Sequence, residues 1–332
     1  MKILMTGGGT GGHIYPGLAV AKELMCQGHV VYWGGRSAGM EKDLVQDLPY
    51  LWFWALALRS KNIFLQVKAI LALFGSVVLG IFYLKRYRID CVLTWGGYVS
   101  VAPALSAYLL RVPVVCFEQN TKLGLANRLI ANIATRHLSG LACEDARFMT
   151  VGNPIRQAIV SVKPNEDAKR LLIVGGSLGA SFLRENLLQA ILEKFPELPI
   201  TCIVGRNGLG KIHHEWLRLY PQLRLLEYCH DMANLYAETG FVISRSGAMA
   251  VSEILALGIR TIFVPLPQSA DNHQWYNAIS AQSEGIEVAG ESAADIIEKL
   301  RVWQMGSWKK PVPRPNDALV QIVAVLSRFS RS

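Results

Sequence analysis

Two glycine-rich turns are the residues of this sequence best suited to bind an anion. The first is Gly7-Gly-Gly-Thr-Gly-Gly12, followed by His13, and the second is Gly175-Gly-Ser177. Each follows a short apolar run and precedes a helical pattern. Glycine lets the backbone approach a ligand closely, and the free amides at a helix start attract negative charge. Histidine adds a side chain that can exchange a proton near neutral pH. These turns therefore predict binding of phosphorylated ligands, with an acid–base group beside the first.

The elements that must position these turns alternate between strands and helices. The expected helices include Tyr15–Gln27, with Pro16 near its start and Gly28 after its end, and Tyr98–Leu110. Strands alternating with helices predict parallel sheets covered by helices on both faces. Two glycine turns predict two similar doubly wound α/β domains facing a central cleft. The expected strands are Ile3–Thr6, Val30–Trp33, Cys91–Thr94, Val112–Phe117, Arg136–Leu141, Arg170–Val174, Ile200–Val204, Leu223–Glu227, Phe241–Ser244 and Thr261–Val264.

The composition agrees with a folded, two-domain protein. The chain has 332 residues, of which 51% are hydrophobic and 18% charged, so it can bury large cores and is not of a disordered class. The start of the sequence does not resemble a signal peptide. Six scattered cysteines without a Cys-x-x-Cys pair predict reduced thiols in a cytosolic protein, with neither a disulfide framework nor a metal site.

The net charge of +9 is concentrated in one segment. Leu51–Arg88 holds six basic residues and no acidic one, interleaved with eight aromatic residues. The segment is too apolar for a nucleic-acid surface and better suits an interface with anionic lipid. Its core, Ala69–Leu84, is the longest apolar run, with 16 residues that include Gly75 and Gly80, shorter than the roughly 20 that span a membrane. We expect first a mostly buried core helix, second a helix that also rests on a membrane surface, and least a transmembrane span.

The first glycine turn formally matches the dinucleotide fingerprint, Gly7-x-Gly9-x-x-Gly12. A dehydrogenase would also show an acidic residue at the end of the second strand to hold the ribose. Here that strand ends in Arg36, which could instead accept a 2′-phosphate. An NADPH-dependent oxidoreductase therefore stays open as an alternative from a different class.

Six stretches in order along the chain carry a more specific pattern, which resembles the MurG family. The family adds N-acetylglucosamine to the undecaprenyl-linked muramyl-pentapeptide, converting lipid I to lipid II in peptidoglycan synthesis. The resemblance implies a GT-B architecture, with an acceptor domain at 1–153, a UDP-sugar domain at 154–315, and a last helix at 316–332 that crosses back to the first domain. The stretches are Gly8–His13, Trp95–Ser100, Phe117–Asn120, Gly152–Arg156, Gly175–Ser177 and Ser244–Glu253.

The resemblance implies that the donor, UDP-N-acetylglucosamine, is held mainly by the second domain. Glu253 would accept the ribose hydroxyls, unless it is only a solvent-facing helix residue. Arg156, and after it Arg245, would face the diphosphate, and Gln274 would hold the sugar. The backbone at Cys229 would contact uracil. The full set of predicted donor-binding residues is Thr10, Gly11, Gly12, Asn120, Arg156, Ser177, Cys229, Arg245, Ala248, Met249, Ala250, Val251, Ser252, Glu253 and Gln274.

The implied reaction inverts the anomeric carbon as the muramyl 4-OH displaces UDP, and it requires a general base. His13 is the first candidate, with helix capping or sugar binding as its alternative roles. Glu118 is the second, although support of the following loop is the favoured interpretation there. Gly96, Gly97 and Tyr98 would bind the acceptor. No cofactor and no metal are expected, because helix amides and arginine can stabilise the leaving diphosphate.

The implied location is the cytoplasmic face of the bacterial inner membrane, as a peripheral protein docked through Leu51–Arg88. Proteins of cell-wall synthesis and cell division are candidate partners, and nucleic acid is not. Two departures from the family pattern affect the contacts: Val101 replaces a frequent glycine, and Leu178 replaces a frequent glutamine. The nearest alternative is a GT-B transferase with another lipid acceptor, such as a diacylglycerol glycosyltransferase. A catalytically inert membrane scaffold is the least favoured.

Overall fold

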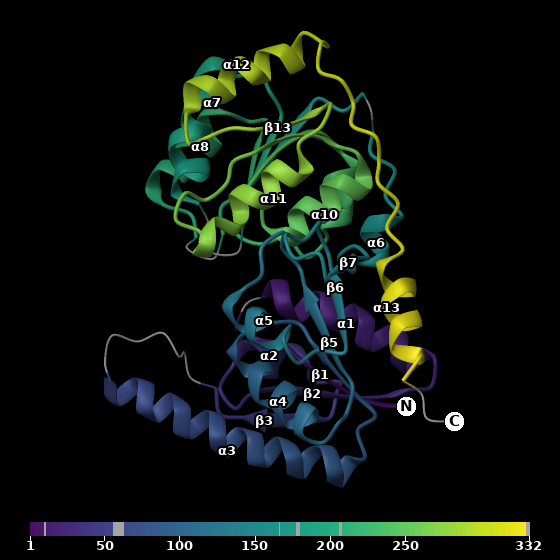
Figure 1. Cartoon of the computed structure of the whole chain (residues 1–332). Coiled ribbons are helices and arrows are strands. Elements are labelled where there is room, and N and C mark those ends of the chain that lie inside the picture. Colours follow the sequence, from purple (N-terminus) through teal and green to yellow (C-terminus); the bar gives the residue numbers. More distant parts are fainter. Residues whose placement is uncertain (10, 56–62, 166, 177–179, 206–207, 330–332) are drawn as a thin grey trace. The chain divides into compact units, whose positions relative to one another are not determined.

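The chain folds into two compact units. In the computed structural model, the residues described are 1–9, 11–55, 63–165, 167–176, 180–205 and 208–329. Unit 1 comprises Met1–Ile155 and the residues from Asn316 onward, and unit 2 comprises Arg156–Pro315 (Figure 1). The chain thus leaves unit 1 two residues after the predicted boundary at 153. Three residues discussed above, Thr10, Ser177 and Leu178, lie outside the described residues.

Unit 1 is built on a sheet of parallel strands in the order β3-β2-β1-β4-β5-β6-β7. The edge strands β3 and β7 were not predicted. The elements are β1 (Lys2–Thr6), α1 (Gly11–Cys26), β2 (Val30–Arg36), α2 (Met40–Leu44), β3 (Tyr50–Phe53), α3 (Ile63–Tyr87), β4 (Cys91–Thr94), the 3₁₀ turn η1 (Tyr98–Ser100), α4 (Val101–Leu109), β5 (Val114–Glu118), α5 (Leu125–Ile130), β6 (Arg136–Ser139), β7 (Met149–Thr150) and α13 (Ala318–Ser327).

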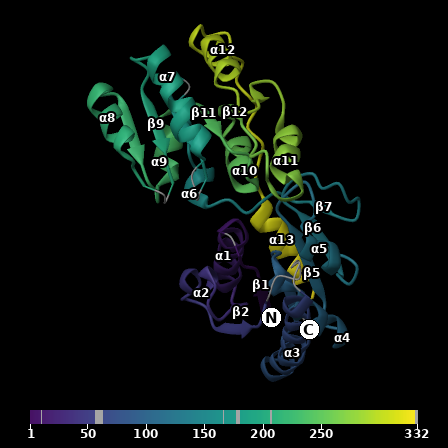
Figure 2. The same ribbon diagram turned by 90° about the vertical axis from the view of Figure 1, so that its left-hand side faces the viewer.

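Both faces of this sheet are buried, as the continuous apolar runs of the strands require. Side chains alternate along a strand, so Ile3 and Met5 of β1 enter one core and Leu4 enters the other. The first core includes residues of α1 and α13, and these two helices pack together although they come from opposite ends of the chain (Figure 2). The second core is closed by α3, α4 and α5. The sheet is therefore held rigidly, with its carboxyl edge positioned by helices on both sides.

Helix α1 begins at Gly11, four residues before the predicted start. The prediction placed the helix after the glycines because glycine has a low helix propensity. Pro16 consequently lies inside the helix and not at its first turn, where its missing amide removes a single hydrogen bond near the start. The early start brings the amides of Gly11 and Gly12 into the helix N-terminus, directly after the first glycine turn.

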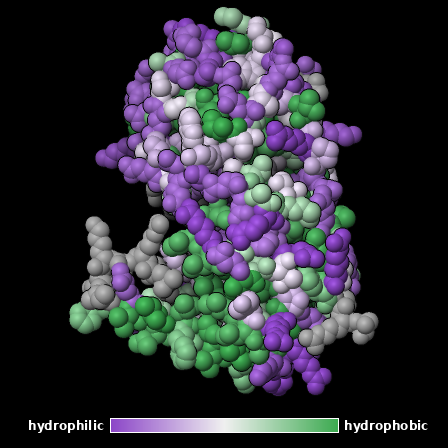
Figure 3. Space-filling view, in the orientation of Figure 1, coloured by the Kyte–Doolittle hydropathy of each residue, from purple (hydrophilic) through white to green (hydrophobic). Residues whose placement is uncertain are grey.

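Helix α3 is longer and far less buried than the predicted core helix, so that prediction was wrong. Gln66–Tyr87 is long and apolar enough to cross a membrane, by length and composition, and only 28% of its most apolar stretch is buried. The buried side includes Ser76 and Leu84. The outward side is an apolar stripe that appears as a band of hydrophobic side chains in Figure 3. We call this the α3 stripe, and its residues are Phe64, Val67, Ile70, Leu71, Phe74, Val78 and Phe82.

Unit 2 repeats the architecture with parallel strands in the order β10-β9-β8-β11-β12-β13. Only the short edge strand β13 among these was not predicted. The elements are α6 (Gln157–Val160), β8 (Arg170–Val174), the π-helical turn η2 (Phe182–Leu187), α7 (Leu188–Lys194), β9 (Ile200–Ile203), α8 (Lys211–Leu219), β10 (Leu223–Leu226), α9 (Met232–Ala237), β11 (Thr239–Ser244), α10 (Ala248–Leu257), β12 (Arg260–Phe263), the 3₁₀ turn η3 (Ala270–Asn272), α11 (His273–Ala281), β13 (Ile286–Val288) and α12 (Ala293–Gln304).

Candidate functional site

Each sheet has a point where the strand order reverses, and both glycine turns lie there. In unit 1 the reversal falls between β1 and β4, and in unit 2 between β8 and β11. The first glycine turn follows β1, and Gly175-Gly176 follows β8. In open α/β sheets, ligands bind at the carboxyl ends of the strands at such a switch point. The fold thus gives each unit one candidate binding region.

In unit 1, the turns after β1 and β4 pack directly on each other. A Cβ atom at Gly97 would lie 2.7 Å from the Gly8 carbonyl oxygen, and one at Gly7 would lie 2.7 Å from Cβ of Trp95. Gly97 also has a φ of 80°, which favours glycine. The Ser100 hydroxyl lies within hydrogen-bonding distance of the carbonyl oxygens of both Thr6 (3.1 Å) and Gly96 (2.8 Å). The predicted acceptor residues are therefore joined to the first glycine turn as one backbone surface.

His13 lies on this surface, in the first turns of α1. Its Nδ1 is 3.0 Å from the Gly8 carbonyl oxygen. A carbonyl only accepts, so Nδ1 carries the proton, and in the neutral ring Nε2 carries the lone pair. A Cβ at Gly96 would be 3.6 Å from this Nε2, which places the ring beside the second turn. The geometry gives His13 the tautomer that a general base acting through Nε2 needs.

Glu118, the second candidate base, is committed to the loop that follows β5. Its buried carboxylate accepts hydrogen bonds from the backbone amide and side-chain amide of Asn120 (3.0 and 2.9 Å). It also accepts from the Gly124 amide (3.0 Å) and from Nδ2 of Asn127 (2.9 Å). Four donors engage both carboxylate oxygens and fix them to this loop and to α5. This arrangement favours the loop-supporting role over catalysis.

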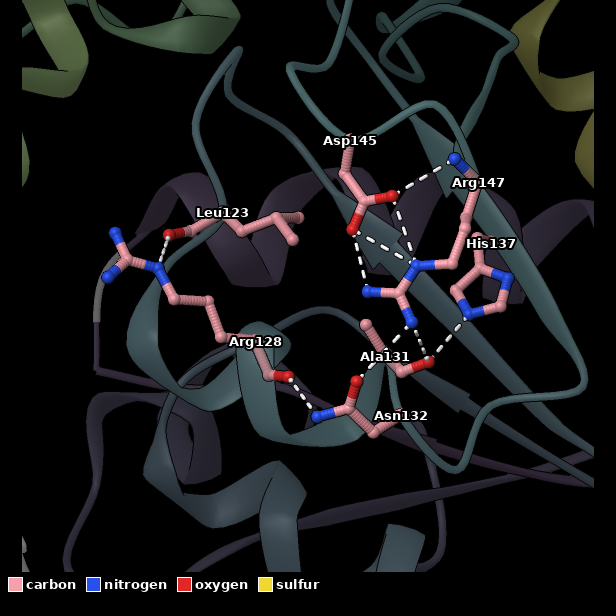
Figure 4. A network of polar contacts seen from close by, with 7 residues as sticks. All are labelled: Leu123, Arg128, Ala131, Asn132, His137, Asp145 and Arg147. Carbon is pink, nitrogen blue, oxygen red and sulfur yellow. Dashed lines mark hydrogen bonds and ion pairs between the residues drawn. The ribbon is translucent and has the colours of Figure 1, made fainter.

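Helix α5, which follows this loop, is fastened at its end by a network around Arg147, shown in Figure 4. Arg147 forms an ion pair with Asp145 at 2.7 Å and donates to the carbonyl oxygen of Ala131 (3.2 Å) and to Oδ1 of Asn132 (3.3 Å). His137 Nε2 lies 2.8 Å from the same Ala131 oxygen. Hydrogen bonds from Arg147 hold the pKa of Asp145 at about 2. The network ties the end of α5 to the segment between β6 and β7.

Arg36, the residue on which the oxidoreductase alternative depended, is paired with a buried acid. Glu41 is fully buried, and its Oε1 accepts from the Arg36 amide (2.9 Å) and from Nε of Arg36 (3.4 Å). A Cβ at Gly8 would lie 2.8 Å from that carboxylate. The position that holds the ribose or its phosphate in a dinucleotide site thus carries an internal ion pair under the first glycine turn.

In unit 2, the candidate region is a cavity of about 260 Å³ at the carboxyl ends of β8 and β11. Gln274 is anchored at its edge, because its Oε1 accepts from the Leu266 amide at 3.0 Å. The Ser246 hydroxyl donates to the Gln274 carbonyl oxygen at 2.7 Å, which ties α11 to the turn after β11. Helix α10 starts here after Gly247, so the backbone at Ala248, Met249 and Ala250 forms its first turn. The lining residues include Gly175, Gly176, Arg245, Gly247, Ala250 and Gln274.

Arg245 lines this cavity but is engaged in structural contacts. Its Nη1 donates to the carbonyl oxygens of Val264 (3.0 Å) and Pro265 (3.1 Å), and its Nη2 forms an ion pair with Glu291. The guanidinium thus joins the turn after β11 to the end of β12. The charge of Arg245 is largely neutralised by Glu291, so the prediction that it faces a diphosphate loses its basis. Arg156 is the better candidate.

Three predicted or neighbouring side chains, Tyr236, Arg156 and Cys229, lie near Glu253 on α10. The Tyr236 hydroxyl of α9 donates to Oε2 of Glu253 at 3.0 Å. Arg156 caps the start of α6, which packs on both α9 and α10, and its Nη1 donates to the carbonyl oxygen of His230 (3.4 Å). Burial raises the pKa of Glu253, while Tyr236 and Arg156 both lower it. Burial also raises the pKa of the neighbouring Cys229 thiol and of Tyr236. Glu253 is therefore no solvent-facing helix residue.

The remaining predicted residues are distributed as follows. Val251 and Ser252 are buried one turn into α10. Tyr98 begins η1 and is half-buried. Within the described ranges, no group of three His, Cys, Asp or Glu side chains could hold a metal ion. The described site residues thus form two groups, one around His13 in unit 1 and one around Glu253 and Gln274 in unit 2.

Two parallel-sheet units, each with a glycine turn at its switch point, define the GT-B class of glycosyltransferases. The chain belongs to glycosyltransferase family 28, and within it to the MurG family. The family's N-terminal domain matches residues 3–139 and its C-terminal domain matches residues 170–301. The chain is therefore a hexosyltransferase, and an oxidoreductase is excluded.

Relatives and solved structures agree with this assignment. The chain is 35% identical over 91% of its length, and 87% of the relative's, to an enzyme of Pectobacterium carotovorum named UDP-N-acetylglucosamine–N-acetylmuramyl-(pentapeptide) pyrophosphoryl-undecaprenol N-acetylglucosamine transferase. It is 34% identical over 99% of both chains to the Erwinia tasmaniensis enzyme of the same name. The crystal structure of Acinetobacter baumannii MurG matches with a TM-score of 0.80 and 28% identity, covering 98% of this chain and 99% of that one.

Two residues at these sites were missed by sequence reasoning. Asn127 donates from Nδ2 to Glu118 Oε2 and to the Phe117 carbonyl oxygen (2.9 Å each), and a Cβ at Gly96 would lie 3.4 Å from the same nitrogen. Tyr236 holds Glu253. Neither carries a local signal, because each meets its partner across two elements that are separate in the sequence.

Proposed function

We propose that this enzyme transfers N-acetylglucosamine from UDP-N-acetylglucosamine to the 4-OH of the muramyl sugar of lipid I, forming lipid II with inversion at the anomeric carbon. The names of the relatives supply the substrates. The observation that carries the mechanism is the His13 geometry, with Nδ1–H bound to the Gly8 carbonyl oxygen at 3.0 Å. The proton of the attacking hydroxyl passes to Nε2, the C1–O bond to UDP breaks, and UDP leaves with the bonding electron pair.

The donor contacts follow from the unit 2 geometry. Oε1 of Glu253 accepts the ribose hydroxyls, while Oε2 is held by Tyr236. Arg156 and the first amides of α10 stabilise the charge that develops on the diphosphate. Gln274 presents its side-chain amide to the sugar, because its Oε1 is already occupied by the Leu266 amide. Thr10, Ser177, Asn120, Gly11, Gly12 and the backbone at Cys229 complete the proposed contacts, and the reaction uses no metal or other cofactor.

The acceptor approaches along the turns at Gly96, Gly97 and Tyr98, and its lipid chain requires a membrane surface. The α3 stripe supplies that contact. Its members recur at helical spacing on the side of α3 away from the core, and Lys68, Lys85 and Arg86 are exposed on the same helix. Apolar residues flanked by basic ones favour the surface of an anionic bilayer. We therefore propose peripheral binding at the cytoplasmic face of the plasma membrane, beside other proteins of cell-wall synthesis and division.

The test is transfer of labelled N-acetylglucosamine to a short-chain lipid I analogue by the wild type, His13→Ala and Glu253→Ala. General-base catalysis contributes about 10²- to 10⁴-fold, so His13→Ala should lower kcat within that range at nearly unchanged KM for the donor. Glu253→Ala should mainly raise the donor KM. Transfer to a diacylglycerol and not to the lipid I analogue would reassign the acceptor. Full kcat in His13→Ala would remove the proposed base.

A further inference from the structure

We infer that Tyr236 is a positioning residue for donor recognition, which fixes the Glu253 carboxylate so that a single oxygen is presented to the ribose diol. This inference rests on the proposed donor site and extends it. The hydrogen bond from the Tyr236 hydroxyl to Glu253 Oε2 is 3.0 Å long. Tyr236 lies on α9 and is therefore outside the Ser244–Glu253 motif that contains Glu253.

Burial makes this hydrogen bond an obligatory one. The Tyr236 side chain is 1% exposed, so its hydroxyl has no water to bond with and must find a protein acceptor. Burial and the nearby Glu253 charge raise the pKa of Tyr236 well above its ordinary value. The hydroxyl therefore stays protonated and remains a donor over the whole working pH range. The tyrosine is a fixed donor aimed at one carboxylate oxygen.

The two carboxylate oxygens of Glu253 differ in their hydrogen bonds, as recognition of the ribose hydroxyls requires. Oε2 accepts from Tyr236, whereas no donor among the described residues reaches Oε1. The side chain is only partly buried, so it keeps some contact with solvent. A carboxylate held at one oxygen has lost most of its rotational freedom before the ligand arrives. Holding a binding group in advance raises affinity because less ordering is needed on binding.

The Tyr236 hydrogen bond also determines the charge on Glu253. Burial raises the pKa of this carboxyl, and the bond from Tyr236, followed by the Arg156 charge, lowers it. Tyr236 comes from α9 and Arg156 precedes α6, which packs on both α9 and α10, and Cys229 acts on Tyr236 from the loop before α9. Helix α11 also packs on α10, and within the described residues it adds no group that shifts this pKa. Ionised Glu253 accepts both ribose hydroxyls, so donor affinity falls as pH decreases through its pKa.

The test compares binding of UDP and 2′-deoxy-UDP to the wild type and Tyr236→Phe by calorimetry across a pH series. Loss of one hydrogen bond to a charged group should raise the Kd for UDP about tenfold. The Kd for 2′-deoxy-UDP should change much less, so that the discrimination between the two ligands shrinks. Without the Tyr236 bond, the pKa of Glu253 rises, and the acidic loss of UDP affinity should move to higher pH. Tyr220→Phe removes a hydroxyl elsewhere in unit 2 and should leave both Kd values unchanged.

Glu253→Gln provides the second variant. It removes the titrating group, so its UDP affinity should be independent of pH over the range where the wild type changes, with and without Tyr236→Phe. An equal loss of affinity for both ligands in Tyr236→Phe, without a shift of the pH profile, would mean that the tyrosine only packs and would overturn the inference. Normal discrimination by the wild type with no effect of Tyr236→Phe would also overturn it, while the proposed donor site would stand. Failure of the wild type to bind UDP would overturn both.

Discussion

Replacement of Glu118 by alanine separates a structural from a catalytic role for this residue. The carboxylate accepts four hydrogen bonds from the loop after β5, and its side chain is buried. Hydrogen bonds to a charged group contribute about 1.5 to 3 kcal/mol each when intact. The donors at Asn120 and Gly124 are only part-buried and can be hydrated after the change, whereas Asn127 Nδ2 keeps its bond to the Phe117 carbonyl oxygen.

The expected loss is therefore smaller than the sum of four bonds, at about 3 to 5 kcal/mol for a buried network broken at its acceptor. For a domain of this size, that corresponds to a decrease in Tm of about 6 to 20 °C in the transition of unit 1. Differential scanning calorimetry of the full chain measures it, and Glu118→Gln, which keeps the shape and one acceptor oxygen, should give a smaller decrease.

Activity provides the second measurement. If Glu118 supports the loop, kcat and Tm should both decrease in Glu118→Ala and recover together in Glu118→Gln. An unchanged Tm in both variants, combined with a loss of kcat of more than a hundredfold, would refute the structural reasoning. It would also make Glu118 the base in place of His13.

Three further outcomes are expected. The double change Leu71→Ser and Phe74→Ser should weaken sedimentation with anionic vesicles at least tenfold and leave Tm unchanged, because both side chains are exposed; unchanged sedimentation would exclude the α3 stripe as the docking surface. In the native protein Cys26 should react with a thiol reagent, while Cys202, whose pKa burial raises to about 12, should react only after unfolding; mass spectrometry of labelled peptides measures both. The lowered pKa of Asp145 adds stability that is present above the unfolded pKa of this group and is lost as pH falls through about 2. Asp145→Asn should therefore lower the free energy of unfolding at pH 6 by about 1 kcal/mol or less and have no effect near pH 2. Denaturant titrations at the two pH values measure this difference.

Continuous apolar runs made most of the fold predictable. Strands β4 and β8 have the bounds expected from the sequence, since each is a short apolar run buried on both faces. The missed strands β3, β7 and β13 have four, two and three residues and lie at sheet edges, where one side of the strand lacks a neighbour. Element type thus followed from composition, whereas the extent of each sheet depended on pairing between distant segments.

The hydrophobic pattern of helix α3 does not show which side of the helix is buried. Both its buried and its exposed side are apolar, so periodicity gives no face to assign to the core. The prediction of a buried helix followed from the general expectation that apolar residues are inside. Only the tertiary structure shows that the sheet and α4 cover one side, where the Ser106 hydroxyl donates to the Val77 carbonyl oxygen at 2.9 Å.

The candidate site likewise contains features that could be predicted from the sequence and features that could not. Glycine turns and the motif around Glu253 follow from local residue types, so their positions at the switch points could be predicted. The partners that set their chemistry come from other elements: the Gly8 carbonyl for His13, Asn127 for Glu118, and Tyr236 for Glu253. Arg245 is the weaker candidate to face the diphosphate for the same reason, because its ion pair with Glu291 joins residues far apart in the chain.

The packing of α13 on α1 has a consequence for the order in which the protein forms during synthesis. Unit 1 contains the first residues to leave the ribosome, but its core includes Ile322 and Leu326 of α13, which are made after all of unit 2. Domains generally fold as units while the chain emerges. Unit 2 can therefore finish folding first, and the nascent first unit exposes part of the α1 side of its core until α13 has been made. During that interval, this exposed part of the unit 1 core is the part of the chain most in need of a chaperone.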